Sequence, residues 1–140
     1  PALAEGRAAS GRFDDEVEIS CQTITMIGSN DAEIERARQK ARAQMAFYGP
    51  TPAYRIVLDH HGWGDLQPEL NRLSKEGRWA EMAGRISDEM VDAVGVSGTP
   101  LEAGRKLAER NRFAARTSLV LYNETAPDAV MDLLRGIRGG

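Results

Sequence analysis

Residues 16–49 read "EVEISCQTITMIGSNDAEIERARQKARAQMAFYG" and place a strand pattern, a glycine turn and a helix pattern in direct succession. The first part is rich in Val, Ile and Thr and ends mostly apolar, which is typical of a buried strand. Asn30 can cap the following helix, since Glu33 stands at its third position. This stretch therefore predicts a βα unit. The apolar stripe of its helix, at steps of three and four residues, comprises Ile34, Ala37, Ala41, Met45 and Tyr48.

The same order returns twice toward the end of the chain. Residues 92–98 form a short strand pattern, and Thr99 can cap the helix that follows it. Residues 115–124 form a strong strand pattern, and Thr125 is the expected cap of the last helix. Three strands that each lead within a few residues into a helix predict parallel pairing, right-handed crossovers and the α/β class.

Between these units, residues 50–92 contain no convincing strand. The pattern predicts a helix within 51–62, a second within 67–77 and further helices within 78–94. Glycines at the ends of the first two segments are typical C-terminal stops. We therefore expect a helical insertion between the first βα unit and the other two.

Composition narrows the class of protein. The chain of 140 residues has a formal charge of −3, with 41% hydrophobic and 28% charged residues, which is ordinary for one globular domain. This charge argues against a nucleic-acid binder, and no apolar run approaches the roughly 20 residues of a membrane helix. The single cysteine, Cys21, excludes an internal disulfide and predicts a cytoplasmic location. The chain opens on Pro1 without methionine, as a processed or excised segment would.

Four motifs together resemble a known family. They are A-F-Y-x-x-T-P-A-Y-R at 46–55, H-G-W-G-D at 61–65, G-x-W-x-E-M at 77–82, and D-E-M-V-D-A-x-x-V-x-G-T-P at 88–100. Their order resembles the carboxy-terminal part of the bacterial luciferase-like monooxygenase family, in particular its deazaflavin-dependent oxidoreductases. The resemblance covers essentially the whole chain.

The resemblance implies an eight-stranded barrel that holds FMN or the deazaflavin coenzyme F-420 at the carboxyl ends of its strands. A complete barrel takes about 250 residues. We therefore expect residues 1–140 to be a single domain, a partial (β/α) TIM-type barrel of three parallel βα units, with residues 50–92 as a flap over its mouth. Three strands leave two open sheet edges, which predicts a homo-oligomer or association with a chain that supplies the missing strands.

The loops after the three strands are the expected cofactor site. Function in such barrels lies at the carboxyl ends of strands, and N–H groups at helix starts suit a phosphate. The alternative is that Asn30, Thr99 and Thr125 only cap their helices. The predicted cofactor-binding residues are Gly28, Ser29, Gly98, Thr99, Tyr122 and Asn123.

Residues 54–63 raise the question of a metal or substrate site. His60 and His61 are adjacent, so on a helix they point about 100° apart and do not chelate one metal. No H-x-x-x-H spacing accompanies them, and we predict no metal site. The resemblance implies substrate contacts here, for which the alternative is a packing role. The predicted substrate-binding residues are Tyr54, His60, His61 and Trp63.

The resemblance therefore implies part of an FMN- or deazaflavin-dependent oxidoreductase of the monooxygenase type that acts on a small organic substrate. The cofactor does the chemistry in such enzymes, so an isolated chain of this length is expected to be inactive. No catalytic residue is identified. The alternative is a non-catalytic α/β module that oligomerises through its open sheet and binds a small ligand.

Overall fold

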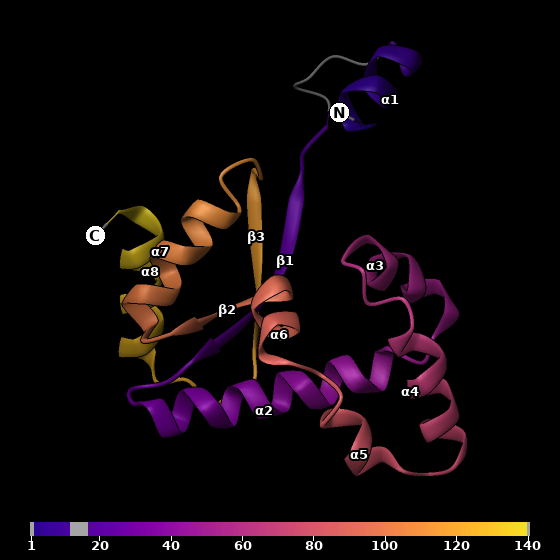
Figure 1. The fold of residues 1–140 in the computed structure, drawn as a ribbon. Coiled ribbons are helices and arrows are strands. Elements are labelled where there is room, and N and C mark those ends of the chain that lie inside the picture. The colour runs from indigo at the N-terminus through magenta and orange to yellow at the C-terminus, as the bar shows by residue number, and fades with distance from the viewer. Residues whose placement is uncertain (1, 12–16, 140) are drawn as a thin grey trace.

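The structure, a computed structural model, describes residues 2–11 and 17–139. In this part of the chain, no helix is long and apolar enough to cross a membrane. The predicted strands and the helical insertion are present (Figure 1). The strands are β1 (Ser20–Ile27), β2 (Gly95–Gly98) and β3 (Arg116–Leu121). The helices are α1 (Ala2–Ser10), α2 (Asp31–Tyr48), the 3-10 turn η2 (Pro52–Tyr54), α3 (Arg55–His60), α4 (Leu66–Lys75), α5 (Trp79–Ala83), α6 (Asp88–Val94), α7 (Pro100–Arg110) and α8 (Pro127–Arg138).

The three strands form one open, parallel sheet in the order β2-β1-β3. Ile27 at the end of β1 pairs with Gly98 of β2, and Ser20 at its start pairs with Arg116 of β3. The α/β class and the three parallel βα units are therefore confirmed. Such an open sheet is consistent with part of a luciferase-like TIM-type fold.

Helices cover both faces of this sheet. On β1, Ile24 and Met26 point into a core formed with α2 and the helical insertion. The next residue, Ile27, points into a second core with α7 and α8, because side chains alternate across a strand. The first strand lies in the centre, with β2 on one side and β3 on the other, and α2 and α7 cover opposite faces of the sheet. The chain therefore changes winding direction between β1 and β3.

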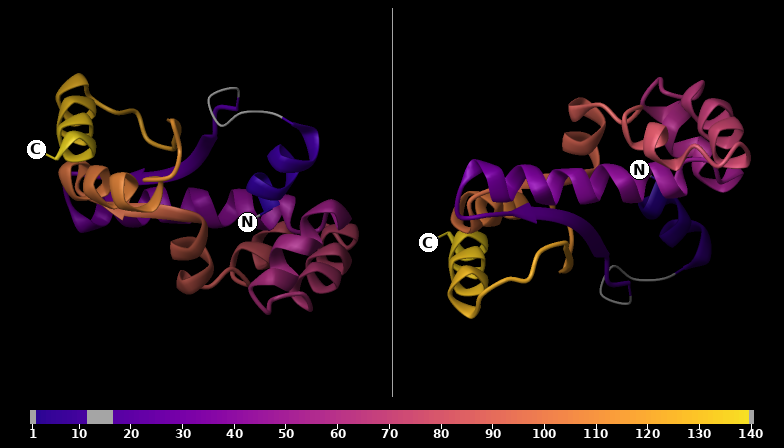
Figure 2. Two further views of the ribbon diagram at one scale, coloured as in Figure 1. Left: turned by 90° about the horizontal axis from the view of Figure 1, so that it is seen from above. Right: turned by 90° about the horizontal axis from the view of Figure 1, so that it is seen from below.

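Within the insertion at 50–92, the helices α3, α4 and α5 lie at one end of α2, and α7 and α8 lie at the other end (Figure 2). This segment leaves the carboxyl end of α2 and returns to the start of β2. Connectivity thus puts it at the amino end of β2. The resemblance implies a flap over the carboxyl ends of the strands, and this role of the insertion stays a prediction.

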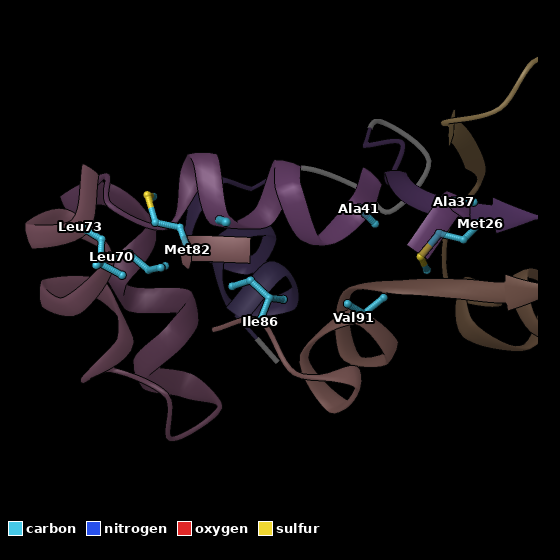
Figure 3. Close-up of a cluster of buried hydrophobic side chains, with 9 residues drawn as sticks. Met26, Ala37, Ala41, Leu70, Leu73, Met82, Ile86 and Val91 are labelled. Atoms are coloured by element: carbon cyan, nitrogen blue, oxygen red, sulfur yellow. The ribbon is translucent and has the colours of Figure 1, made fainter. Parts of the chain in front are cut away.

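The core under the insertion is built from small residues of α2 and large residues of α4 and α5 (Figure 3). Ala37 and Ala41 of the predicted stripe are buried and let the other elements approach α2 closely. Leu70, Leu73 and Met82 belong to the same cluster and are fully buried. Burial of each such side chain stabilises the fold by roughly 1.5–3 kcal/mol.

An ion network joins α6 to α2. Arg38, whose side chain is only 12% exposed, donates to Asp88 at 2.7 Å, Asp92 at 2.5 Å and the Ser97 hydroxyl at 2.9 Å. Arg42 also pairs with Asp88. The guanidinium of Arg38, followed by that of Arg42, holds the pKa of the Asp88 carboxyl below its ordinary value. The network positions the segment that leads into β2.

Two of the predicted helix caps are present and one is wrong. Asn30 accepts a hydrogen bond from the Glu33 N–H at 3.0 Å, and the Thr99 N–H donates to Glu102 at 3.0 Å. The last helix is preceded by Ala126, which is extended (φ −61°, ψ 147°), because a residue before proline avoids the helical region. Thr125 instead donates its hydroxyl to the carbonyl of Asn123 inside the loop.

Candidate functional site

A cavity of about 410 Å³ opens at the carboxyl ends of β1 and β3, where the chain changes winding direction. We call it the switch-point cavity. Open α/β sheets bind ligands in the crevice at such a point, because the loops of the two strands diverge there. Its polar walls come from the β1–α2 loop, the first turns of α2 and the β3–α8 loop. These polar residues are Ser29, Glu33, Arg36, Lys40, Asn123, Glu124 and Thr125.

Asn123 and Lys40 hold the two loops together. The Asn123 amide donates to the carbonyls of Ile27 at 3.1 Å and Glu33 at 3.4 Å. The Lys40 ammonium donates to the carbonyl of Tyr122 at 2.8 Å and approaches the Asn123 side-chain oxygen at 3.5 Å. The end of β3 is thereby tied to both the end of β1 and the α2 helix.

Two cations of α2 face this cavity. Arg36 and Lys40 are four residues apart, so they share one side of the helix. The Arg36 side chain is 66% exposed, and its nearest carboxylate oxygen, on Glu33, lies at 3.9 Å. At that distance and exposure the pair is weak, which leaves the guanidinium available to an anion from solution.

Internal carboxylates already occupy two of the predicted N–H donors. Glu33 accepts from the Ser29 N–H at 2.8 Å, and this bond lowers the pKa of Glu33. Glu102 accepts from the Thr99 N–H, which lowers the pKa of Glu102 in the same way. In the β3–α8 loop, by contrast, the N–H groups of residues 125 and 126 make no hydrogen bond within the described chain. Within the described chain, no internal carboxylate occupies these two N–H groups of the third loop.

The structure brings together only part of the predicted cofactor site. Gly28, Ser29 and Asn123 line the switch-point cavity. Tyr122 contributes its carbonyl to Lys40, while its ring packs against the core under the insertion. Gly98 borders the site, since its carbonyl accepts from the Gly28 N–H at 3.3 Å. Thr99 is not among the residues of the wall, although Pro100 beside it is.

The four predicted substrate residues lie elsewhere. Tyr54 and Trp63 line a second cavity of about 200 Å³ beside the carboxyl-terminal half of α2. His61 stacks on Trp63 with ring centres 4.6 Å apart, and His60 meets His61 edge-on at 5.3 Å. Their contact with substrate stays a prediction. Across residues 2–11 and 17–139, no three His, Cys, Asp or Glu side chains are grouped so as to hold a metal ion.

The Tyr122 hydroxyl is buried and has no hydrogen-bond partner among the described residues. Burial raises the pKa of Tyr122, and the neighbouring Tyr48 adds to that shift. Because an unpaired buried hydroxyl is destabilising, we expect Tyr122→Phe to raise the free energy of unfolding by about 1 kcal/mol. Urea denaturation measures this, with Tyr48→Phe as the control at an exposed tyrosine. A loss of stability in Tyr122→Phe would mean that the hydroxyl has a partner.

Sequence reasoning missed Arg36 and Lys40. Both lie in "RARQKARAQ", where acidic neighbours make the stretch resemble an ordinary mixed helical surface. The available signal is their spacing of four residues on the helix that directly follows a strand and its loop.

This chain is similar to known proteins over most of its length. The profile of the luciferase-like monooxygenase family matches residues 1–117. An uncharacterized protein of Mycobacterium tuberculosis is 54% identical over 98 residues, which cover 70% of this chain and 29% of that protein.

Two relatives with a stated activity are more distant. A 5,10-methylenetetrahydromethanopterin reductase of Archaeoglobus fulgidus is 31% identical over 107 residues, covering 71% of this chain and 31% of the reductase. The reductase of the same name from Methanopyrus kandleri is 23% identical over 129 residues, which cover 91% of this chain and 36% of that reductase. The chain spans about a third of the length of these curated relatives. Because the family profile extends over most of the 140 residues and the four motifs agree with it, this chain belongs to the luciferase-like monooxygenase family.

Proposed function

We propose that this chain forms the phosphate-binding part of a flavin or deazaflavin site in an oxidoreductase of the monooxygenase type acting on a small organic substrate. Family membership supports an oxidoreductase function, and two relatives are named reductases. The observation that carries the proposal is the switch-point cavity, where Arg36 and Lys40 stand beside free N–H groups at the start of α8.

The residues of this cavity fit the anionic end of such a cofactor. FMN and coenzyme F-420 both carry a phosphate, which suits an arginine, a lysine and backbone N–H donors. A volume of about 410 Å³ is within the range of cofactor pockets. No aromatic side chain is among the described residues of its wall, so we assign only the phosphate end to this chain.

The cofactor, when bound, supplies the hydride transfer or the oxygen activation, and the protein supplies binding and orientation. Arg36 would bind the phosphate, because its guanidinium is exposed and only weakly paired. Lys40 would orient the β3–α8 loop against it through the Tyr122 carbonyl. Glu33 keeps the β1–α2 loop in place by holding the Ser29 N–H. We locate this activity in the cytoplasm, which the free thiol of Cys21 supports.

The test compares FMN with riboflavin, the same flavin without phosphate, in fluorescence titrations of the purified chain. We expect FMN to bind more tightly than riboflavin. We expect Arg36→Gln to weaken FMN binding by about 5- to 10-fold and to leave riboflavin binding unchanged. One charge-assisted contact at an exposed site contributes about 1 kcal/mol, which is this fold-change. Raising the salt concentration should shrink the difference between the two ligands. The same titration compares coenzyme F-420 with the deazaflavin that lacks its phosphate.

Arg112→Gln is the matched control. Like Arg36, Arg112 is an exposed arginine that pairs with a glutamate three residues earlier, here Glu109 at 3.2 Å, but it lies outside the cavity. We expect it to change FMN affinity by less than about 2-fold. Equal binding of FMN and riboflavin, or equal losses in both variants, would contradict the proposal.

The alternative function, a non-catalytic module that associates through its open sheet, rests on the edges of that sheet. Near β2, Lys106 donates to the carbonyl of Ser97 at 2.7 Å, and Arg110 donates to those of Asp92 and Ala93. Such basic side chains protect a sheet edge from another strand. No side chain of the described residues bonds a backbone group of β3 in this way.

The unprotected edge of β3 supports association with a second copy or with a chain that supplies further strands. Light scattering of the purified chain separates the two candidate functions. A discrete oligomer without flavin affinity favours the module, and phosphate-dependent flavin binding favours the oxidoreductase. We expect no turnover by the isolated chain, because the described wall of the cavity holds no group for the flavin ring.

A further inference from the structure

The second cavity, which we call the aromatic cavity, has a volume of about 200 Å³. The rings of Tyr48, Tyr54 and Trp63 line it, together with apolar side chains that include Ile24 and Leu58. Tyr48 and Tyr54 meet edge to face with ring centres 5.6 Å apart. The α2 residues of the aromatic cavity are Gln44, Met45 and Tyr48 at the carboxyl end of that helix, whereas the switch-point cavity uses residues 33, 36 and 40 nearer its start.

The wall is apolar and uncharged but carries several unused hydrogen-bonding groups. Gln44 has an amide, Tyr48 and Tyr54 have hydroxyls, and Trp63 has an indole N–H. None of these side-chain groups has a hydrogen-bond partner within the part of the chain that the structure describes. No Asp, Glu, Lys or Arg lines the cavity in that same part. A charged ligand would lose its hydration here without gaining an ionic partner, whereas a hydroxyl or carbonyl would gain a hydrogen bond.

Size and ring geometry narrow the ligand further. A dry cavity of about 150 Å³ lined by apolar side chains holds benzene. The aromatic cavity is somewhat larger, so it has room for one substituted ring or two fused rings. Aromatic walls favour an aromatic guest, because edge-to-face and offset contacts add about 0.5–1.5 kcal/mol beyond burial of area. The side chains of Tyr48, Tyr54 and Val57 are each nearly half exposed, so a guest would also cover apolar surface that now faces water.

We propose that the aromatic cavity binds a small, uncharged aromatic molecule of one or two rings that carries a hydroxyl or carbonyl group. This site is separate from the proposed cofactor site, since the two cavities share no residue of their described walls. The inference therefore does not depend on flavin binding.

p-Cresol is the probe, and p-toluate, which replaces its hydroxyl by a carboxylate, is the charged control. Calorimetry and ligand-observed NMR on the full chain measure both. We expect p-cresol to bind saturably with a dissociation constant of about 1 mM or below, as small fragments do in such pockets. We expect p-toluate to bind at least about 10-fold more weakly because of the cost of burying its charge. Lack of saturation by p-cresol, or equal affinity for both compounds, would overturn the proposal.

Val57→Trp tests the location by filling the cavity from the half-exposed face of α3. We expect it to weaken p-cresol binding at least about 10-fold, since a bulky ring takes the place of the guest. Phe113→Trp is the matched control, because Phe113 is exposed and lies outside both cavities. Phe113→Trp and Arg36→Gln should both leave the affinity for p-cresol unchanged. The Arg36→Gln variant thus separates failure of the cofactor proposal from failure of this one. If Val57→Trp fails to fold, Tyr54→Ala is the second variant to test. Undiminished p-cresol binding in whichever of these variants is folded refutes the site.

Discussion

Gly104→Ala is expected to lower the free energy of unfolding by about 3 kcal/mol, a large effect for one methyl group. The helices α7 and α8 cross at Gly104 and Gly136, and a Cβ on Gly104 would lie 2.8 Å from the Gly136 Cα and would collide with the carbonyl of Leu133. Both obstacles are backbone, which does not move aside as a side-chain end does. The helices must therefore separate, and α8 packs mainly on α7.

Separation of these helices would also expose Leu133, which is fully buried between them and the sheet. Chemical denaturation followed by circular dichroism measures the loss. The matched control is Gly84→Ala, because a Cβ there meets only the Glu81 carbonyl at 3.4 Å and the backbone is right-handed helical (φ −68°). We expect that control to stay within about 0.5 kcal/mol of the parent or to gain slightly. If Gly104→Ala matches Gly84→Ala, the close crossing of α7 and α8 is refuted.

Gly28→Ala is expected to lower the free energy of unfolding by about 2–3 kcal/mol and to weaken FMN binding. A Cβ at Gly28 would lie 2.6 Å from the Ile34 nitrogen and 2.8 Å from the Glu33 carbonyl carbon, both in the first turn of α2. That turn must then move away from β1. Because Arg36 stands on the next turn, the same displacement alters the switch-point cavity.

Two measurements on one sample check this prediction: denaturation for stability, and flavin titration under conditions where the variant is folded. Gly6→Ala is the control, since a Cβ there meets nothing within 4 Å. We expect it to leave both quantities unchanged. A Gly28→Ala variant that loses stability but keeps full FMN affinity would show that the first turn of α2 does not shape the phosphate site.

Much of the candidate site lies in loops that the sequence predicts, because a loop after a strand is a local feature. The cap of Asn30 by Glu33 spans three residues, so its spacing is readable directly. Thr125 misled the prediction because Pro127 moves the helix start by one residue. Lys40 was missed because its partner, the Tyr122 carbonyl, is 82 residues away. Such pairings follow from tertiary structure, which periodicity and spacing do not reveal.

The sequence by itself determined the α/β class, the three parallel βα units, the helical insertion and the family to which the chain belongs. Each of these depends on patterns that are complete within one element or motif. Only the tertiary structure decided the strand order β2-β1-β3 and the helices that cover each face of the sheet. It also decided that Asn123 meets Ile27 across 96 residues, where the switch-point cavity forms. The physical reason is that strand order and faces depend on which distant side chains pack together, as Met26 and Ile27 show by pointing into different cores.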